Sequence, residues 1–368
     1  MTHPHSSSPL RVGLIGYGLA GSVFHAPLID SCPDLRLAAV VTANEERARQ
    51  ARSAHGENLR VVADADQLLA DPGALDLVVI ASPNRTHVSL AHAALAAGVP
   101  VVVDKPLAGT AREAWELDAE ARKRGLLLSV FQNRRWDSDL LTLRGLLEQG
   151  ALGTVWRFES RFERWRPRPK GGWRESGDPA EIGGLLYDLG SHLVDQALAL
   201  FGPVTSVYAE SRVLRPGATA DDDTFLALTH ASGVVSHLWM SATAAQLGPR
   251  FRVLGSSGAF VKYGLDPQEA RLRAGDRPGE GRPWGEEDPE AYGTLGDLED
   301  TRAVPSVPGA YPAYYEAVAR ALRQGDPPPV TAAEAARALE VLEAGRLSAH
   351  EGRTVPLPGT DAPAVPNE

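Results

Sequence analysis

The sequence predicts two domains: an α/β domain with a doubly wound parallel sheet, then an α+β domain with an open, largely antiparallel sheet. The chain has 368 residues, which is enough for two domains of ordinary size. Apolar runs alternate with helical patterns as far as Phe131, which is typical of a parallel sheet. From Gly153 onward, strand patterns follow one another with glycine turns between them, which is typical of antiparallel pairing.

The first domain is expected to contain a strand after almost every helix. The run LDLVVIA at residues 75–81 is continuously apolar, as a buried parallel strand should be. Asn84 is expected to cap the helix that follows this run. The predicted strands are 10–15, 35–42, 59–63, 75–81, 99–103 and 126–131, and the predicted helices are 22–31, 45–54, 84–97 and 111–124.

A glycine-rich turn follows the first strand and precedes the first helix. Gly16, Gly18 and Gly21 have the G-x-G-x-x-G spacing in this context. The first glycine permits a tight turn, the second lets the backbone approach a pyrophosphate, and the third lets the helix pack close to the strand. The helix N-terminus offers free N–H groups to phosphates. The pattern predicts a Rossmann dinucleotide-binding domain.

The end of the second strand indicates which dinucleotide is bound. NAD-binding domains usually place an acid there for the ribose 2′-hydroxyl, whereas NADP is favoured by a hydroxyl or a cation. Thr42, Asn44 and Arg47 can serve a 2′-phosphate, so the sequence favours NADP. Glu45 and Glu46 leave NAD open, because a small shift would bring an acid into place.

The second domain is expected to combine an open sheet with helices on one face. The Thr331 and Glu334 pair forms a capping box before the last helix. Residues 266–308 are rich in glycine, proline and glutamate and are expected to make a long excursion over the surface or over the cleft between the domains. The predicted strands are 155–164, 204–212, 224–230, 234–242, 250–254 and 259–263, and the predicted helices are 136–149, 183–202, 311–323 and 332–350.

The helix expected at 183–202 carries the first candidate for chemistry. At helical pitch, Asp188 and His192 are neighbours one turn apart, and Asp195 lies on the same stripe. A carboxylate beside an imidazole can handle a proton. Taken alone, this spacing favours a polar helix face in water.

Lys105 is the second candidate, because it directly follows the fifth strand of the first domain. The nicotinamide of a dinucleotide is expected at this end of the sheet, where a lysine can bond the hydroxyl of a substrate. A solvated surface lysine is the alternative.

Composition bounds the partners and the compartment. The formal net charge is −10 with no basic run, which argues against nucleic acid. The single cysteine, Cys32, excludes an intramolecular disulfide and fits a reducing compartment. We see no signal peptide, no membrane-length apolar run and no zinc-like Cys/His spacing, so we expect a cytoplasmic chain that binds neither a membrane nor a metal. A sheet face without helices predicts a homodimer or homotetramer.

The order of three motifs resembles the Gfo/Idh/MocA family of oxidoreductases. These are GYGLAG at 16–21, DKP at 104–106 and GGLLYDLGSHLVDQ at 183–196. Strings at 21–29, 126–142, 173–177 and 260–275 are similar to a branch of the family that acts on scyllo-inositol with NADP. The resemblance implies a Rossmann NADP-binding domain at 10–132 and a substrate-binding and oligomerisation domain at 133–353, between an arm at 1–9 and a tail at 354–368.

The resemblance implies an enzyme that transfers a hydride between NADP and a secondary alcohol or ketone of a cyclic polyol or sugar. Scyllo-inositol with 2-keto-myo-inositol is the first substrate pair. An aldose such as glucose or xylose is the second candidate, and a non-catalytic NAD(P)-sensing regulator is the third. Retention of Lys105, Asp188 and His192 together speaks against the regulator.

Site residues follow from the matching positions. Lys105 would polarise the hydroxyl, His192 would be the general base, and Asp188 would orient both substrate and His192. Substrate contacts would come from these three residues. Arg166 and Trp173 are added because guanidinium and indole groups suit hydroxylated rings, and the alternative for these two is a solvated basic loop or a subunit contact. The implied cofactor residues are Gly16, Tyr17, Gly18, Leu19, Ala20, Thr42, Asn44, Arg47, Ser82, Pro83, Asn84, His87, Asp104, Lys105, Asn133, Arg134 and Trp136. The sequence departs from the family's usual glutamate at Asp104, which is expected to shift a ribose contact only slightly.

Overall fold

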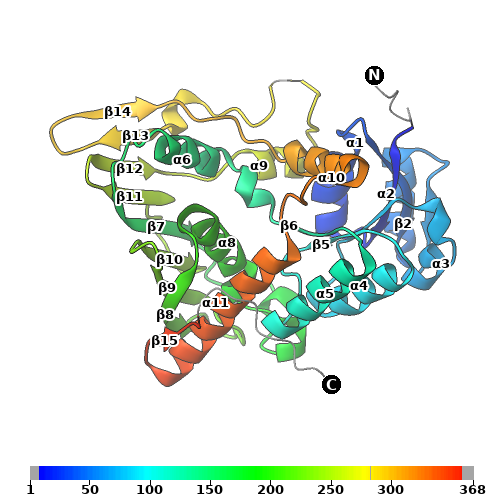
Figure 1. The fold of residues 1–368 in the computed structure, drawn as a ribbon, viewed down its shortest axis with the longest axis horizontal. Coiled ribbons are helices and arrows are strands. Elements are labelled where there is room, and N and C mark those ends of the chain that lie inside the picture. The colour runs from blue at the N-terminus through cyan, green and yellow to red at the C-terminus, as the bar shows by residue number, and fades with distance from the viewer. Residues whose placement is uncertain (1–7, 282, 359–368) are drawn as a thin grey trace.

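The computed structural model of the chain describes residues 8–281 and 283–358 (Figure 1). Residues 1–7 of the expected arm and 359–368 of the expected tail lie outside these ranges. The part of the tail that is described departs from expectation, because β15 (Val355–Pro356) pairs with β8 (Val204–Arg212) at the edge of a sheet.

The first domain is the expected doubly wound parallel sheet. Its six strands lie in the order β3-β2-β1-β4-β5-β6, and every neighbouring pair is parallel. The middle of this sheet is fully buried, which explains the continuous apolar runs in the sequence. The strands are β1 (Leu10–Ile15), β2 (Leu35–Val41), β3 (Arg60–Val62), β4 (Leu77–Ile80), β5 (Val101–Asp104) and β6 (Leu128–Phe131).

Helices α1 (Ala26–Asp30), α2 (Glu45–His55), α3 (Ala65–Leu69), α4 (His87–Ala96) and α5 (Ala111–Arg124) connect these strands. The short helix α3 was not expected. The helix predicted from residue 22 begins instead as a π-helical segment, η1 (Ala20–His25), in which the Ala26 N–H donates to the Gly21 carbonyl.

Asn84 does not cap a helix, contrary to prediction. The chain first forms a 3₁₀ turn, η3 (Asn84–Thr86), and α4 begins only at His87. The Asn84 side chain donates instead to the Ile182 carbonyl, 3.3 Å away in the second domain. A partner that is distant in sequence has therefore replaced the local cap.

The second domain is a nine-stranded sheet of order β14-β13-β12-β11-β7-β10-β9-β8-β15. Its one parallel pair is β7 with β10, and the other pairs are antiparallel, as expected for a largely antiparallel sheet. The remaining strands are β7 (Val155–Glu163), β9 (Asp223–His230), β10 (Val235–Ser241), β11 (Phe251–Gly255), β12 (Gly258–Lys262), β13 (Gly293–Gly296) and β14 (Thr301–Val304).

The segment 266–308 is more ordered than the sequence indicated. It contains helix α9 (Gln268–Ala274) and strands β13 and β14, which extend the sheet beyond β12. These strands carry the residues GTLG and TRAV, which lack a clear apolar alternation. β13 forms by pairing with the open edge of β12, and β14 then pairs with β13. The local sequence does not show that this edge is available for pairing.

The helix predicted at 183–202 is broken in the structure. It consists of α7 (Leu185–Asp188) and α8 (Gly190–Phe201), with Leu189 at φ −105° and ψ −37° between them. The His192 N–H bonds the Leu189 carbonyl rather than that of Asp188. The break therefore separates Asp188 from the helix that carries His192.

Helices on one face of the second sheet join the two domains. Helix α11 (Ala332–Glu351) packs on β8 and α8 of the second domain and on α5 of the first (Figure 1). Its expected capping box between Thr331 and Glu334 is present. The other two helices of this domain are α6 (Ser138–Glu148), which follows a 3₁₀ turn η4 (Asn133–Trp136), and α10 (Pro312–Gln324).

We predict that Gly21→Ala destabilises the first domain. A methyl carbon at Gly21 would stand 2.0 Å from the Gly16 carbonyl oxygen, so the helix would have to move away from the glycine turn. Overpacking of this kind costs about 1–3 kcal/mol of unfolding free energy, measurable by urea denaturation. Gly145→Ala on α6 is the control, because its nearest atom lies at 3.9 Å and alanine favours helices. Equal stability of Gly21→Ala and the native chain would contradict the close approach.

Candidate active site

The glycine turn has the shape of a dinucleotide cradle. Gly16 has a φ of +100°, and a Cβ there would stand 2.7 Å from the Ala81 carbonyl oxygen. At Gly18 a Cβ would meet only the Arg47 guanidinium, at 3.8 Å, among the described atoms. The turn is therefore packed against protein at Gly16 and Gly21 and open at Gly18, where the backbone is expected to approach a pyrophosphate.

Tyr17 and Leu19, between these glycines, point in different directions. The Tyr17 side chain is buried, and its hydroxyl lies 2.9 Å from His55 Nε2 on α2. Leu19 is exposed, and Ala20 begins η1. The Tyr17 ring faces the protein, which leaves the backbone of this turn as the part that can meet a cofactor.

The end of β2 presents a cation beside the glycine turn. Asn44 Oδ1 accepts the Arg47 N–H at 2.9 Å and so caps α2, while the Thr42 hydroxyl accepts the Asn44 N–H at 3.3 Å. This arrangement brings the Arg47 guanidinium next to Gly18. Glu46, one of the two acids that kept NAD open, instead binds Arg49 and Gln50 along the helix.

His87 braces the loops that follow β4 and β5. Its Nδ1 lies 2.8 Å from the Pro106 carbonyl oxygen, and its Nε2 lies 2.9 Å from that of Ser82. Burial lowers the pKa of the ring. Because both ring nitrogens face the backbone, His87 shapes the strand ends rather than reaching outward. The Ser82 hydroxyl and the Pro83 carbonyl are joined to Thr86 in the same turn.

Asp104 is held by a residue that sequence reasoning did not single out. His25 Nε2 lies 3.9 Å from the Asp104 carboxylate, and His25 Nδ1 bonds the Tyr315 hydroxyl at 2.6 Å. Burial raises the pKa of Asp104, but His25, Lys105 and His87 outweigh it and hold the pKa below its ordinary value. His25 lies in the string at 21–29, but no local pattern indicated its partner.

Lys105 bridges the domains to Asp188. Its Nζ donates to the Asp188 carbonyl oxygen at 2.6 Å and to the carboxylate at 3.0 Å. The helix break at Leu189 leaves this carbonyl available. Arg174 and Arg164 also face the carboxylate, at 3.9 and 4.0 Å. Burial raises the pKa of Asp188, but these cations, Lys105 first, lower it to about 2.

His192 has a separate partner. Its Nδ1 lies 3.1 Å from Oε1 of Gln132, at the end of β6. Burial lowers the pKa of His192 well below its ordinary value, and Lys105, Arg134 and Arg250 lower it further. The ring is therefore neutral near pH 7. We expected Asp188 to orient His192. In the structure Asp188 binds Lys105 instead, and His192 binds Gln132.

The two halves of the chain also match known families. The model described as "Oxidoreductase family, NAD-binding Rossmann fold" matches residues 10–132, and "Oxidoreductase family, C-terminal alpha/beta domain" matches residues 144–357; both are Gfo/Idh/MocA models. The chain belongs to the Gfo/Idh/MocA family. It is accordingly an oxidoreductase with an NAD(P)-binding Rossmann domain.

Relatives of this oxidoreductase cover nearly its whole length. The chain is 44% identical to "Uncharacterized oxidoreductase YdgJ" of Escherichia coli over 95% of this chain and 99% of that protein. It is 37% identical to the scyllo-inositol 2-dehydrogenase (NADP(+)) IolW of Bacillus subtilis over 95% and 96%. It is 30% identical to the D-apiose dehydrogenase of Paraburkholderia graminis over 89% and 85%.

A solved structure shares the same architecture. The oxidoreductase yvaA of Bacillus subtilis superposes with a TM-score of 0.89 at 35% identity, covering 96% of this chain and 100% of that one.

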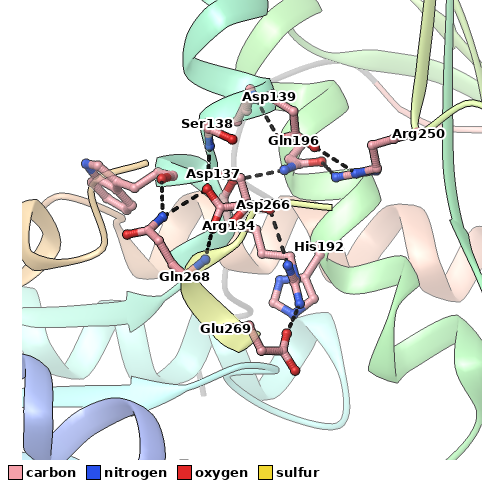
Figure 2. Close-up of polar contacts among 12 residues, drawn as sticks. Arg134, Asp137, Ser138, Asp139, His192, Gln196, Arg250, Asp266, Gln268 and Glu269 are labelled. Atoms are coloured by element: carbon pink, nitrogen blue, oxygen red, sulfur yellow. Dashed lines mark hydrogen bonds and ion pairs between the residues drawn. The ribbon is translucent and has the colours of Figure 1, made fainter. Parts of the chain in front are cut away.

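Around His192, this family member carries a buried network of charged groups (Figure 2). Arg134 lies between Asp137, at 3.2 Å, and Glu269 of α9, and its guanidinium stacks on the Phe162 ring at 4.7 Å. Gln196 joins the Arg134 carbonyl to Arg250. Arg134 is therefore held rigidly beside the site by carboxylates, and its cofactor contact stays a prediction.

The remaining predicted residues lie at different depths. Asn133 is buried, and the Trp136 ring packs on Tyr314 of α10 with centroids 5.5 Å apart. The Arg166 N–H donates to the Ala242 carbonyl at 2.8 Å. The guanidinium of Arg174 lies 4.2 Å over the Trp173 ring, so Trp173 supports an arginine that faces Asp188. Arg174 lies in the string at 173–177, but no pattern in the sequence singled it out.

Asp195 is a supporting residue rather than part of a solvated face. It is 2% exposed, and both its oxygens bind Arg135, at 2.7 and 2.8 Å. Arg135 also binds Glu334, the capping-box residue of α11. The polar stripe of α8 is thus tied to the first turn of α11.

Within residues 8–281 and 283–358, no helix is long and apolar enough to cross a bilayer.

We predict that the Asp188 ion pair contributes to stability in a pH-dependent way. Asp188 has a folded pKa of about 2 against an ordinary value of 3.8, so the unfolded chain binds more protons between these values. The contribution is therefore full above about pH 5 and is lost progressively as pH falls from about 5 to about 1; its size is about 2 kcal/mol. Urea unfolding of the native chain and of Asp188→Asn from pH 6 down to pH 3 measures it. The difference between the two chains should narrow as pH falls, and a constant difference would contradict the assigned pKa.

Proposed function

We propose that this protein is an NADP-dependent dehydrogenase that interconverts a secondary alcohol and a ketone on a cyclic polyol or sugar, with scyllo-inositol and 2-keto-myo-inositol as the first pair. The observation that carries the proposal is the meeting of Lys105, from the cofactor domain, with Asp188 beside the neutral, buried His192. The name of the relative IolW supports the choice of inositol. A sugar is the second candidate, since another relative is named D-apiose dehydrogenase.

The glycine turn, Thr42, Asn44 and Arg47 would hold the cofactor's phosphates, and the ends of β4, β5 and β6 would surround its nicotinamide ribose. When bound, the nicotinamide supplies the hydride acceptor for oxidation and the hydride donor for reduction. The open Gly18 and the guanidinium beside it fit such a group.

The chain's own residues would handle the proton. Lys105 donates a hydrogen bond to the hydroxyl oxygen of the substrate and stabilises negative charge that develops there. Asp188, kept ionised by its cations, holds Lys105 in place. His192, kept neutral by burial, accepts the hydroxyl proton and returns it during reduction. Their surroundings lower the pKa of both Asp188 and His192, so that Asp188 stays charged and His192 stays neutral.

The second sheet offers a surface for self-association, and we infer a homodimer or homotetramer that uses it. The face turned away from α8 and α11 carries, among the described residues, the partly buried rings of Phe225, His237 and Trp239, whose centroids lie 5.1–5.9 Å apart. A sheet face with partly exposed aromatic rings is suited to packing against the same face of a second copy. We also infer a reducing, cytoplasmic setting, in which the buried thiol of Cys32 stays free.

We predict turnover of scyllo-inositol with NADP, followed as NADPH absorbance, with myo-inositol, glucose and D-apiose assayed in parallel. Lys105→Ala and His192→Ala should each lower kcat by about 10²- to 10⁴-fold, because each removes a group that moves or stabilises the proton. Both variants should still bind NADPH, measured by fluorescence.

Normal rates in both variants would show that the proton mechanism is wrong. NADPH binding by the native chain without turnover of any polyol or sugar would instead favour the regulator.

We predict that Arg47→Ala lowers the preference for NADP over NAD by about 10- to 100-fold in kcat/KM, since it removes one charge-assisted hydrogen bond to the 2′-phosphate. The rate with NAD should change little. Arg49→Ala, on the same helix but paired with Glu46, is the matched control and should keep the preference. A native chain that prefers NAD would contradict the assignment of Thr42, Asn44 and Arg47.

A further inference from the structure

The side chain of Gln132 lies between the two domains, in contact with the proposed base. Gln132 is 3% exposed and follows β6 of the first domain. Its Oε1 lies 3.1 Å from His192 Nδ1, and its Nε2 lies 3.5 Å from the Ser191 carbonyl oxygen. Both contacts are to the start of α8 in the second domain, so this amide binds two neighbouring residues of one helix.

The environment of Gln132 permits one orientation of its amide. A carbonyl oxygen only accepts hydrogen bonds, so the group facing Ser191 has to be the NH₂. A flipped amide would set two oxygens against each other. The backbone is fixed too, because the Gln132 N–H donates to Val130 at 2.9 Å and its carbonyl accepts the Arg135 N–H at 3.0 Å. Oε1 therefore faces His192.

Oε1 is an acceptor, so the nitrogen opposite it has to carry a proton. A neutral imidazole has one N–H and one lone pair. With the proton on Nδ1, the lone pair is on Nε2. The other tautomer would place a lone pair against Oε1 and lose the bond.

The charged groups around His192 favour the neutral ring. Lys105 comes from the loop after β5, Arg134 from η4, and Arg250 from the residue before β11. Each of these cations has a carboxylate partner of its own: Asp188, Asp137 with Glu269, and Asp139. The carboxylates are thus committed to the cations, and the ring is left with the uncharged partner Gln132.

We infer that Gln132 is a positioning residue that holds His192 as the Nδ1–H tautomer and so leaves Nε2 free to accept the hydroxyl proton of the substrate. The inference rests on the proposed function for the role of Nε2, but the tautomer itself is a property of the free protein. Since Gln132 and His192 belong to different domains, His192 is held in the Nδ1–H tautomer only when the two domains are in contact.

The first test uses nuclear magnetic resonance on the free protein with ¹⁵N-labelled histidine. The chain has ten histidines, so the signals of His192 are assigned by their loss in His192→Asn. In the native chain we expect a protonated Nδ1 and an unprotonated Nε2. In Gln132→Leu we expect the Nε2–H form to become substantially populated. A native His192 protonated on Nε2, or an unchanged tautomer in Gln132→Leu, would overturn the inference whether or not the polyol reaction is correct.

The second test is the pH dependence of kcat/KM for the oxidation direction. Gln132→Glu keeps the shape of the side chain but places a negative charge beside Nδ1–H, which raises the pKa of His192. The acidic limb of the profile should move up by about one pH unit or more. Gln132→Leu should lower kcat by about tenfold or more, with KM and NADPH binding nearly unchanged.

Gln149→Glu, on an exposed residue at the end of α6, is the matched control and should leave the profile in place. If Gln132→Leu fails to fold, Gln132→Glu still decides the question. An acidic limb that does not move in Gln132→Glu would contradict the contact with His192.

Discussion

The contact of Lys105 with Asp188 joins the two domains at the point where the chemistry is proposed. Lys105 reaches from the end of β5 to both the carbonyl and the carboxylate of Asp188. The carbonyl is available because the backbone breaks at Leu189, and the carboxylate stays ionised because cations surround it. One local distortion of a helix thus provides an ion pair, a domain contact and the position of the proposed catalytic lysine.

The charged groups near the site are arranged so that neighbouring residues have different protonation states. Arg134 and Arg250 are buried, and each is paired with a buried carboxylate: Asp137 and Asp139 (Figure 2). Buried charges are tolerated only when they are paired in this way. Burial lowers the pKa of His192, and these cations lower it further with no acidic partner to oppose them, so the ring remains neutral. The network therefore supports a rigid site with one permanently charged pair and one neutral base.

The cofactor side of the site depends on contacts that lock loops rather than on side chains that point outward. His87 joins the loops after β4 and β5, and His25 joins η1 to Asp104 and α10. Tyr17 likewise turns toward α2. Tyr17 lies in the glycine turn and His87 follows the end of β4, so motif reading finds these two residues but not His25. Their role in holding the backbone becomes visible only once the surrounding loops are in place.

The local sequence determined the features that depend on periodicity and backbone geometry. The alternation of strands and helices specified the parallel sheet. The spacing of Gly16, Gly18 and Gly21 specified the cradle, because each of these positions requires a residue without a side chain for a reason set by the turn itself. The resemblance of short motifs, added to this, indicated Lys105, Asp188 and His192. It did not show how they are paired.

Tertiary structure decided the strands β13 and β14, the break at Leu189 and the partners of the proposed catalytic residues. The strands form on the open edge of β12, which local propensity does not encode. Lys105 and Asp188 are 83 positions apart, and Gln132 and His192 are 60 apart. Helical spacing paired Asp188 with His192, but in the structure Asp188 binds Lys105 and His192 contacts Gln132, and both partners belong to the other domain. Such partners exist only after two domains have folded and met, so no local pattern could name them.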